Sequence, residues 1–479
     1  MTRPSIALIV DHPQRDLAGL VLTAFELCQR GYDCHLVPLN LQDTEVWALA
    51  PDFVLLNYLR RFNEPFLRRL VQARIPYGLL DTEGAVFGSM EEYTELHCED
   101  VGLLHGARCA CIWGPRVAQH LLDEGLYGRE QVQVTGCPRF DLYAPAWRSV
   151  VAEGNGALGN GRPRILMNTN FSIVNPRFTT SEQNIALYHA QLGWSMERLK
   201  EFTDTERVAI DETIELARAI AARFPDCTVV LRPHPHESPE PYRTALAGVP
   251  NIELNVDGPV QPQIFRAAAV VQRSCTTAIE ATLSGVPTLS PRWITPPMEA
   301  PMSEAVSIGC ESPEAVFATL AEVLSGSYVP DDELRRETEC IITEWFHRRD
   351  GLAHQRVADT VAAAARGERE VDERLCRRFM HGLYTDERNR EPHVANRLRH
   401  ALGLSPHWSA RKLRPIPEEW WMESDKVFTA AQVRELAARV ASAYRVSGRD
   451  ARPVGVRASR ESDRYIHSSF LGQSVTLAC

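Results

Sequence analysis

Short apolar runs alternate with helical stretches along most of the chain. The first run, Ser5–Val10, leads into the polar turn DHPQRD and then into LAGLVLTAFELCQRG, which ends on Gly31. A continuous apolar run of this length predicts a strand of a parallel sheet buried on both faces, and a glycine often ends a helix. The chain therefore begins with a strand–turn–helix unit.

The same pattern recurs through the first 150 residues. Five further apolar runs read CHLVPLN, DFVLLNYL, IPYGLLD, CACIWG and VQVTG, and helical stretches such as EPFLRRLVQAR and PRVAQHLLDEG lie between them. Strands that alternate with helices predict a doubly wound parallel sheet, because each crossover helix returns the chain to the same sheet edge. We expect residues 1–151 to form a Rossmann-like domain.

A second α/β domain is expected after a linker. Residues 152–163 read AEGNGALGNGRP, a composition typical of a flexible connection. The alternation then resumes with RILMNTNFS, a helical stretch near residues 205–224, TVVLRPHPHE, AVVQRSCTT and VPTLSPRW. We expect a Rossmann-like domain over residues 164–340, followed by a helix at 341–365 that returns to the first domain. Two such domains commonly bind a ligand in the cleft between them.

The remaining residues, 366–479, have a different character. They start with mixed charges, as in RGEREVDERLCRRF, and one amphipathic helix is expected at residues 429–444, with Val433, Leu436, Val440 and Tyr444 on one face. The last thirty residues look irregular. We expect a charged, helical or irregular extension that is solvated or docks a partner, and we assign it no chemistry.

Composition narrows the class of protein. A formal net charge of −10 argues against a protein that coats nucleic acid, which needs a basic surface. The twelve cysteines are scattered, and the one close pair, Cys109 and Cys111, has a poor spacing for zinc; we expect one buried and one exposed thiol on a strand. The N-terminus resembles neither a signal peptide nor a membrane span. We therefore expect a reduced, cytoplasmic protein whose contact with the inner membrane, if any, is peripheral.

Two segments point to a phosphate site in the second domain. Residues 229–237 read VVLRPHPHE and residues 270–288 read VVQRSCTTAIEATLSGVPT, and each is an apolar strand that runs into a polar turn. Parallel strands end at one sheet edge, where open α/β sheets bind ligands. The groups delivered there suit phosphate oxygens, because they are a guanidinium, imidazoles, hydroxyls and the amides of a helix start. They belong to Arg232, His234, His236, Ser274, Thr276 and Thr277.

Each of these residues also has a simpler interpretation. Thr276 and Thr277 lie where hydroxyls routinely cap a helix. Glu280 follows Thr276 by four residues, and its carboxylate would either accept from a ribose hydroxyl or be an ordinary surface group. His234 would bind phosphate, donate a proton to a leaving group, or be held by neighbouring loops. Paired histidines also suggest a metal, but no third ligand of suitable spacing stands near.

The first domain offers a candidate base. The strand YGLLD ends in DTEG, so Asp81 and Glu83 flank a turn that Gly84 permits, at the carboxyl end of a strand. A general base facing the cleft is expected there, although a solvated turn would look the same. In the turn DHPQRD, Arg15 and Asp16 form either an internal ion pair or contacts to an acceptor, and the sequence leaves both open.

Together these motifs resemble the surface carbohydrate biosynthesis protein family. The stretches PQRDLAGLVLTAFELCQRGY, LLDTEG, CIWGP, VTGCPRFDL, ILMNTNFSIVN, RPHP and SCTTAIEATLSGVP occur in that family's order and span roughly residues 10–365. The resemblance implies a GT-B fold, with two Rossmann-like domains about a cleft and the nucleotide mainly on the second. Within ILMNTNFSIVN, Asn170 is taken as a further nucleotide-binding candidate.

A second resemblance concerns mechanism. Bacterial sialyltransferases and related capsule polymerases share an acidic pair before a glycine, a His-Pro dipeptide and a later Ser/Thr pair. The matching stretches here are Thr82–Gly84, His234–Pro235 and Ser274–Thr277, with Thr82 in place of the first acid. The resemblance implies that Glu83 is the acceptor's base, that His234 is a phosphate ligand or acid, and that the hydroxyls bind the phosphate of CMP.

These observations predict an inverting, metal-independent glycosyltransferase of surface polysaccharide or glycoconjugate synthesis. The expected donor is a nucleotide sugar, preferably a CMP-linked nonulosonate or Kdo-like sugar, the acceptor is a glycan or a lipid-linked glycan, and no cofactor is required. Two alternatives remain. One is another enzyme on the same fold, either a CDP-polyol phosphotransferase or a UDP-sugar hydrolase or epimerase. The other is a non-catalytic nucleotide-sugar-binding protein whose C-terminal extension docks a synthase complex.

Overall fold

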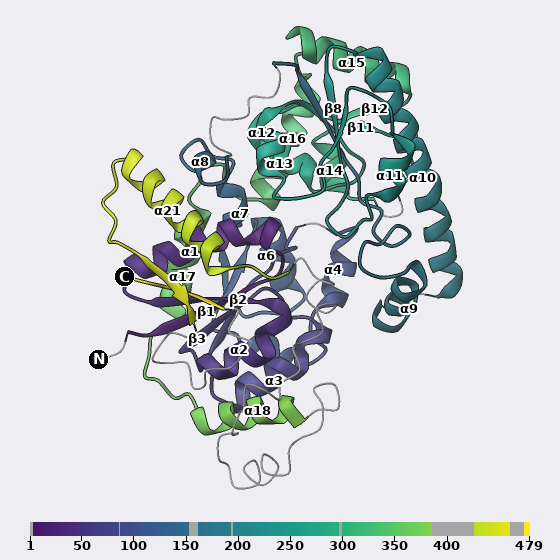
Figure 1. The fold of residues 1–479 in the computed structure, drawn as a ribbon. Helices are drawn as coiled ribbons and strands as arrows, with labels where there is room; N and C mark the ends of the chain where they lie inside the picture. The colour runs from purple at the N-terminus through teal and green to yellow at the C-terminus, as the bar shows by residue number, and fades with distance from the viewer. Residues whose placement is uncertain are drawn as a thin grey trace, which may run out of the picture. The chain divides into compact units, whose positions relative to one another are not determined.

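The structure is a computed structural model that describes residues 3–85, 87–152, 161–192, 195–296, 299–385, 426–459 and 474–479. Most of the expected linker at 152–163 lies outside these residues. The chain divides into two compact units, each with its own sheet (Figure 1). Unit 1 comprises Met1–Ala85, Met90–Val150 and Trp345–Cys479, and unit 2 comprises Val86–Ser89 and Val151–Glu344.

Unit 1 contains an eight-stranded sheet in the order β13-β14-β2-β1-β3-β4-β5-β6. Six strands are parallel: β1 (Ser5–Val10), β2 (Asp33–Pro38), β3 (Phe53–Leu56), β4 (Tyr77–Leu80), β5 (Ala110–Ile112) and β6 (Val132–Val134). Every residue of β1, β3, β4 and β5 is buried, as expected for strands covered on both faces. The order reverses between β1 and β3, which is the switch point of a doubly wound sheet.

Helices join these strands. They are a π-helical turn η1 (Pro13–Leu17), α1 (Ala18–Gln29), α2 (Gln42–Leu49), α3 (Glu64–Gln72), α4 (Met90–Leu96), α5 (Val101–His105), α6 (Pro115–Asp123), α7 (Pro138–Asp141) and α8 (Arg148–Val151), with 3-10 turns η2 (Leu39–Leu41) and η3 (Arg61–Asn63). Gly19 of α1 permits a close approach to α7, because a Cβ atom there would lie 2.8 Å from the backbone nitrogen of Arg139.

Part of the C-terminal region is integral to unit 1. Strand β14 (Val475–Ala478) pairs antiparallel with β2, and β13 (Gly455–Ala458) pairs with β14. Helix α21 (Ala430–Val446) packs on α1, where the rings of Tyr444 and Phe25 lie 5.0 Å apart. The expectation of irregular structure over the last thirty residues is therefore wrong for these two strands, which are too short to show a clear period in the sequence. Residues 386–425, also part of the expected extension, lie outside the described residues.

Two more helices of unit 1 follow unit 2 in the chain. They are α17 (Ala353–Ala364), which packs on α1, and α18 (Glu373–Thr385), which packs on α2. Asp141 holds the start of α17, since its carboxylate accepts from the amides of Ala353 at 3.0 Å and His354 at 2.7 Å. The buried His354 ring adds a contact of 2.7 Å between its Nδ1 and the same carboxylate.

Unit 2 contains a six-stranded parallel sheet in the order β12-β11-β10-β7-β8-β9. The strands are β7 (Arg164–Asn168), β8 (Thr228–Arg232), β9 (Ile252–Leu254), β10 (Ala267–Val271), β11 (Thr288–Pro291) and β12 (Ile308–Cys310). The helices are α9 (Ser181–Leu192), α10 (Met196–Arg223), α11 (Glu240–Ala245), α12 (Gln261–Arg266), α13 (Thr277–Ser284), α14 (Pro301–Ala305), α15 (Pro313–Ser325) and α16 (Asp332–Trp345). This strand order is that of the Rossmann fold, with its switch point between β7 and β10.

The predicted fold class, α/β with two Rossmann-like units, is thus confirmed. One detail differs, because Cys109 and Cys111 are both buried; β5 lies between β4 and β6 with both faces covered. All twelve cysteines lie within the described ranges and none forms a disulfide. No helix of the described residues is long and apolar enough to cross a membrane, and no cluster of three or more metal-ligating side chains occurs among them.

Candidate functional site

The switch point of unit 2 brings three strand ends together. Strand β7 ends in Asn168, its neighbour β8 ends in Arg232, and β10 on its other side leads through Gln272–Thr276 into α13. The register pairs Asn168 with Arg232. The two motifs RPHPHE and SCTT therefore lie at one sheet edge, as predicted from the sequence.

The start of α13 contacts the end of β7 directly. Asn168 donates from Nδ2 to Oγ1 of Thr277 at 3.0 Å, and the Thr277 hydroxyl in turn donates to the sulfur of Cys275 at 3.2 Å. The Asn168 side chain is buried, yet its Oδ1 atom has no hydrogen-bond partner in the structure. Thr276 occupies the N-cap position, but its side chain makes no capping hydrogen bond. The interpretation of Thr276 as a simple cap thus loses its main support.

The Ser274 donors are used within the protein. Ser274 has a left-handed backbone conformation, with φ of 51°, and both its amide and its hydroxyl donate to Oε1 of Glu304, at 2.8 and 3.0 Å. Arg273 pairs with the same oxygen at 2.6 Å, and the Ser290 hydroxyl donates to the other oxygen, also at 2.6 Å. Glu304 thus accepts from both donors of Ser274.

Arg232 is held in a similar way. Its guanidinium is buried and donates to the backbone oxygen of Gly258 at 2.5 Å, to that of Asp257 at 3.4 Å, and to the side-chain oxygen of Asn255. These three acceptors belong to the turn that follows β9. Arg232 therefore fastens a neighbouring turn, a function that the sequence does not reveal because its partners lie more than twenty residues away.

The two histidines of the RPHPHE turn contact each other. The amide of His236 donates to Nδ1 of His234 at 3.2 Å, and the two rings lie 5.5 Å apart. An Nδ1 atom that accepts a hydrogen bond leaves Nε2 to hold the proton of the neutral ring. His234 is thereby oriented with a defined tautomer, which suits a donor to a phosphate oxygen.

Glu237 fixes this turn, and it is not among the residues predicted from the sequence. Its carboxylate is buried and accepts from the amides of Phe171 and His234 and from the hydroxyls of Thr169 and Tyr242. Burial raises the pKa of Glu237, despite the hydrogen bonds that lower it. In the sequence, Glu237 directly follows the segment His234–His236, which begins soon after the buried strand β8 ends at Arg232.

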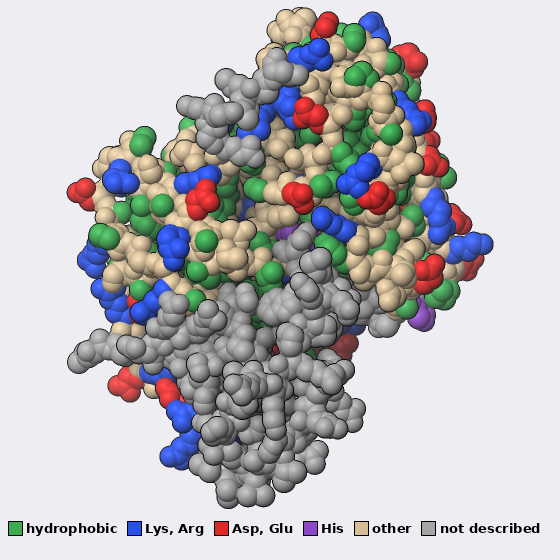
Figure 2. Space-filling view, viewed as in Figure 1, with side chains coloured by type: hydrophobic (Ala, Val, Ile, Leu, Met, Phe, Trp, Pro, Cys, Tyr) green, Lys and Arg blue, Asp and Glu red, His purple; other side chains and the backbone are tan. Residues whose placement is uncertain are grey.

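Two further candidates are Asn170 and Glu280. Asn170 is exposed in the turn after β7, and Glu280 is buried in the first turns of α13. On the described part of the face drawn in Figure 2, basic and acidic side chains are interspersed, and no extended basic patch appears there.

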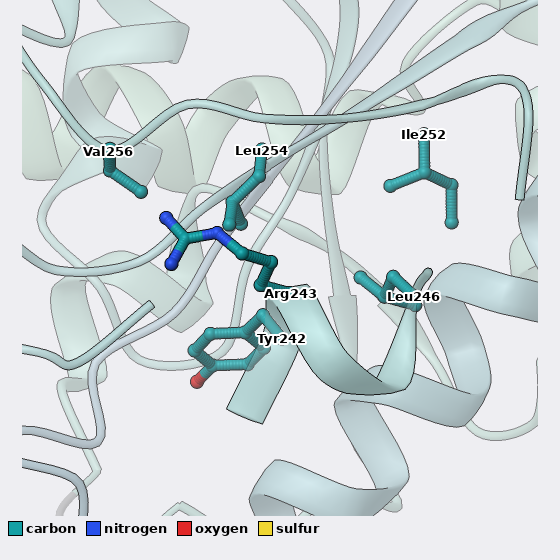
Figure 3. A pocket seen from close by; sticks show the side chains of 6 residues that line it. All are labelled: Tyr242, Arg243, Leu246, Ile252, Leu254 and Val256. Carbon is teal, nitrogen blue, oxygen red and sulfur yellow. The ribbon is translucent and has the colours of Figure 1, made fainter. Parts of the chain in front are cut away.

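A separate pocket of about 210 Å³ lies at the edge strand of unit 2. Its lining is mostly apolar, with Arg243 as its one charged side chain (Figure 3). Arg243 pairs with Glu240. Strand β8 separates β9 from the switch-point strand β7. We therefore assign this pocket no part in phosphate binding. The pocket is lined by Tyr242, Arg243, Leu246, Ile252, Leu254 and Val256.

The switch point of unit 1 holds an ion-pair network. Asp11, directly after β1, accepts from the Tyr58 hydroxyl at 2.6 Å and pairs with Lys426 at 2.9 Å and with Arg15. Burial raises the pKa of Asp11, but Arg15 and Lys426 together lower it by more, so this pKa lies well below its usual value. Arg15 also pairs with Asp16 at 2.9 Å. Of the two interpretations of Arg15 and Asp16, an internal ion pair or contacts to an acceptor, the structure shows the ion pair.

Glu83 belongs to the same network. Its Oε2 pairs with Arg60 at 2.9 Å and its Oε1 with Arg15 at 3.4 Å, while its side chain remains 41% exposed. Asp81 is buried, accepts from the Glu83 amide at 2.8 Å and from Tyr93 at 3.1 Å, and pairs with Arg60 at 3.4 Å. Burial raises the pKa of Glu83 and the two guanidinium groups lower it, with a net decrease. Glu83 is therefore an ionised, accessible carboxylate, and Asp81 orients its turn.

Two neutral groups at this edge have no hydrogen-bond partner. Both ends of the Asn57 amide and the hydroxyl of Thr82 are buried and unpaired in the structure, although Thr82 donates its amide to the Asn57 backbone at 3.3 Å. Buried polar groups normally bind protein, water or ligand. These two residues follow the neighbouring strands β3 and β4, so they add hydrogen-bonding capacity to the edge that carries Glu83.

The sequence matches no model of a protein family and no curated protein. Solved structures that resemble it include a putative UDP-N-acetylglucosamine 2-epimerase from Listeria monocytogenes, with 16% identity and a TM-score of 0.48, covering 78% of this chain and 99% of that one. The UDP-GlcNAc 2-epimerase from Neisseria meningitidis bound to UDP-GlcNAc gives 13% and 0.46, with 75% and 100% covered. CalG4, the calicheamicin glycosyltransferase, gives 15% and 0.42, with 76% and 98% covered. Likeness at this level transfers no residue role and no activity to this chain.

Proposed function

We propose that the protein is an inverting, metal-independent glycosyltransferase that uses a nucleotide-activated sugar. The observation that carries the proposal is the switch point of unit 2. There His234, with a fixed tautomer, and the start of α13, with the uncapped Thr276 and the Asn168–Thr277 pair, lie at adjacent strand ends. Amides of a helix start and an imidazole N–H together favour phosphate oxygens.

The chemistry follows from one displacement. As the acceptor hydroxyl attacks the sugar, a base removes its proton, and donors around the phosphate stabilise the charge that develops on the leaving nucleotide. We assign the first role to Glu83 and the second to His234 and the Thr276–Thr277 turn. The lowered pKa keeps Glu83 ionised at neutral pH, and the Arg15 and Arg60 pairs fix its position.

The residues proposed to bind the nucleotide sugar differ in their contacts. Ser274 and Arg232 donate hydrogen bonds to other groups of the protein, so we propose that they shape the site. We propose that Thr276, Thr277 and His234 contact the phosphate. We keep Asn170, His236 and Glu280 as candidates for ribose or base contacts. A CMP-linked nonulosonate or Kdo-like sugar is our preferred donor, and a glycan or lipid-linked glycan is the acceptor.

Nucleotide binding can be tested by thermal shift with CMP, CDP and UDP, because a ligand that binds the folded state raises its apparent stability. We expect one nucleotide to stabilise the wild type and His234→Ala to abolish that shift. Asp226→Asn, at an exposed position before β8, is the matched control. An equal shift in His234→Ala would remove His234 from the site, and no shift with any nucleotide in the wild type would refute nucleotide binding.

Transfer is tested with Glu83→Gln. With CMP-N-acetylneuraminate or CMP-Kdo as donor and a panel of oligosaccharide acceptors, we expect the wild type to release CMP and form a glycosylated product. The Gln variant should lose at least about a hundredfold in rate, the usual contribution of a general base, and keep its thermal shift with CMP. Normal turnover in this variant would refute the role of Glu83. Hydrolysis or epimerisation of a UDP-sugar, supplied in a parallel assay, would support the alternative enzyme, because the phosphate contacts do not distinguish cytosine from uracil nucleotides.

A further inference from the structure

We propose that Glu237 is a positioning residue of the unit 2 site: its carboxylate holds the turn that carries His234 against the turn that follows β7. This inference rests on the proposed nucleotide-binding function and adds a residue that neither the motifs nor the resemblance assigned. Glu237 acts through its neighbours, since it is 1% exposed and bonds protein groups.

The contacts of Glu237 join two segments that lie far apart in the chain. From the turn after β7, Oε1 accepts from the Phe171 amide at 2.8 Å and both oxygens lie 2.9 Å from the Thr169 hydroxyl. From its own turn, Oε1 accepts from the His234 amide at 3.1 Å, and from α11 Oε2 accepts from the Tyr242 hydroxyl at 2.6 Å. One carboxylate thus satisfies donors from three segments.

The composition of the turn limits its backbone hydrogen bonds. Pro233 and Pro235 have no amide hydrogen, so they cannot donate a hydrogen bond to a neighbouring segment. The backbone of the turn is instead closed by the Glu237 amide, which donates to the oxygen of His234 at 2.8 Å, and joined to the β7 turn by the Thr169 amide, which donates to the oxygen of Arg232 at 3.1 Å. Glu237 therefore contacts His234 through both its amide and its carboxylate.

Losing the carboxylate would leave buried donors unpaired on both turns. An unpaired buried donor costs free energy, so the turns would rearrange toward water or other acceptors. His234 would then lose its fixed orientation, and the His236 amide would no longer hold Nδ1. The expected consequence is weaker nucleotide binding in a protein whose sheet remains intact.

Three variants separate this role from general stability. Glu237→Ala removes every contact of the side chain, whereas Glu237→Asp keeps a carboxyl group but is one methylene too short to reach all three segments. Glu237→Gln keeps one oxygen for the Phe171 and His234 amides and turns its NH₂ group toward hydroxyls that also accept. Tyr242→Phe is the matched control, because it removes one donor and leaves both turns bonded to Glu237.

The measurement is the dissociation constant of whichever of CMP, CDP or UDP binds the wild type, by calorimetry. We expect about tenfold weaker binding for the Ala and Asp variants, equivalent to about 1.4 kcal/mol, and a change of less than about threefold for Gln and for Tyr242→Phe. In ¹⁵N-histidine-labelled protein, the His234 ring should show a protonated Nε2 in the wild type and in the Gln variant, and a mixture of tautomers in the Ala and Asp variants.

The outcomes distinguish this inference from the function on which it rests. If the wild type binds none of the three nucleotides, the proposed function fails and this inference fails with it. If the wild type binds and both Ala and Asp variants bind equally well, with an unchanged His234 tautomer, Glu237 has no positioning role and the nucleotide site stands. If Glu237→Ala does not fold, Asp compared with Gln decides, since equal binding in these two variants overturns the proposal.

Discussion

Glu206 should make the stability of unit 2 fall as the pH rises, and Glu206→Gln should remove that dependence. The side chain lies in α10, is 2% exposed, and accepts from the amide of Val174 at 2.7 Å. Burial raises its pKa, the Val174 amide lowers it, and the nearby Glu237 raises it again, to about 8 in the folded protein from 4.5 in the unfolded chain.

The sign and size follow from proton linkage. Between pH 4.5 and 8 the folded protein holds a proton that the unfolded chain has released, so the free energy of unfolding falls as the pH rises. The slope is about 1.4 kcal/mol per pH unit, and the loss between pH 5 and pH 7 is about 2.5 kcal/mol. The stabilisation is fully present below pH 4.5 and is lost by about pH 8. Glutamine does not titrate and retains an oxygen for the Val174 amide.

The assay is urea denaturation at pH 5, 6, 7 and 8, monitored by hydrogen exchange in peptides that contain β7 and β8. This readout reports unit 2 by itself, which matters because a chain with two units need not unfold in one step. Glu206→Gln should gain stability relative to the wild type by about 2.5 kcal/mol as the pH increases from 5 to 7. Glu201→Gln, exposed on the same helix, should follow the wild-type curve.

Parallel curves for the wild type and Glu206→Gln between pH 5 and pH 8 would refute the reasoning. They would mean that Glu206 is ionised in the folded protein at pH 5, and hence that water or a cation reaches it. A difference that grows as the pH falls would refute the sign itself.

Two further predictions concern unit 1. Leu477→Asp places a charge at a position of β14 that is 0% exposed, so it should destabilise unit 1 by more than about 3 kcal/mol. Rapid proteolytic cleavage of the protein within β2 would show this loss. Val446→Asp, at a position 87% exposed, should have no such effect. Gly19→Ala should cost about 1–3 kcal/mol, because the new Cβ would lie 2.8 Å from the Arg139 nitrogen, and an unchanged melting temperature would show that α1 and α7 separate freely.

The sequence predicts the parts of this protein that depend on local pattern. Buried parallel strands are near-continuous apolar runs, so Ser5–Val10 and the strands before the RPHP and SCTT turns could be recognised without a structure. Their carboxyl ends follow from the alternation of strands and helices, and so does the gathering of His234 and Thr277 at one edge. The α21 helix was recognisable from its period and from Thr429, which forms a capping box with Gln432.

What the sequence does not predict depends on contacts between distant residues. The partner of Ser274 is Glu304, thirty residues further on, and that of Arg232 is a turn beyond the next strand. No local pattern indicates that Glu304 would occupy the amide and hydroxyl of Ser274 or that Glu237 would join two turns. The pairing of β14 with β2 is harder still, because its four residues carry too little periodicity to indicate a register.

That last pairing sets an order of events during synthesis. The ribosome completes β2 at Pro38 and reaches Val475 of β14 only 437 residues later, about 20–90 s at ordinary elongation rates. During that interval the outer edge of β2 lacks its native neighbour, and an unpaired strand edge invites pairing with another chain. Unit 2, whose sheet is built from one continuous segment, is meanwhile fully synthesised. Until β14 emerges, the nascent protein should therefore depend on chaperones, or on competing association being slow.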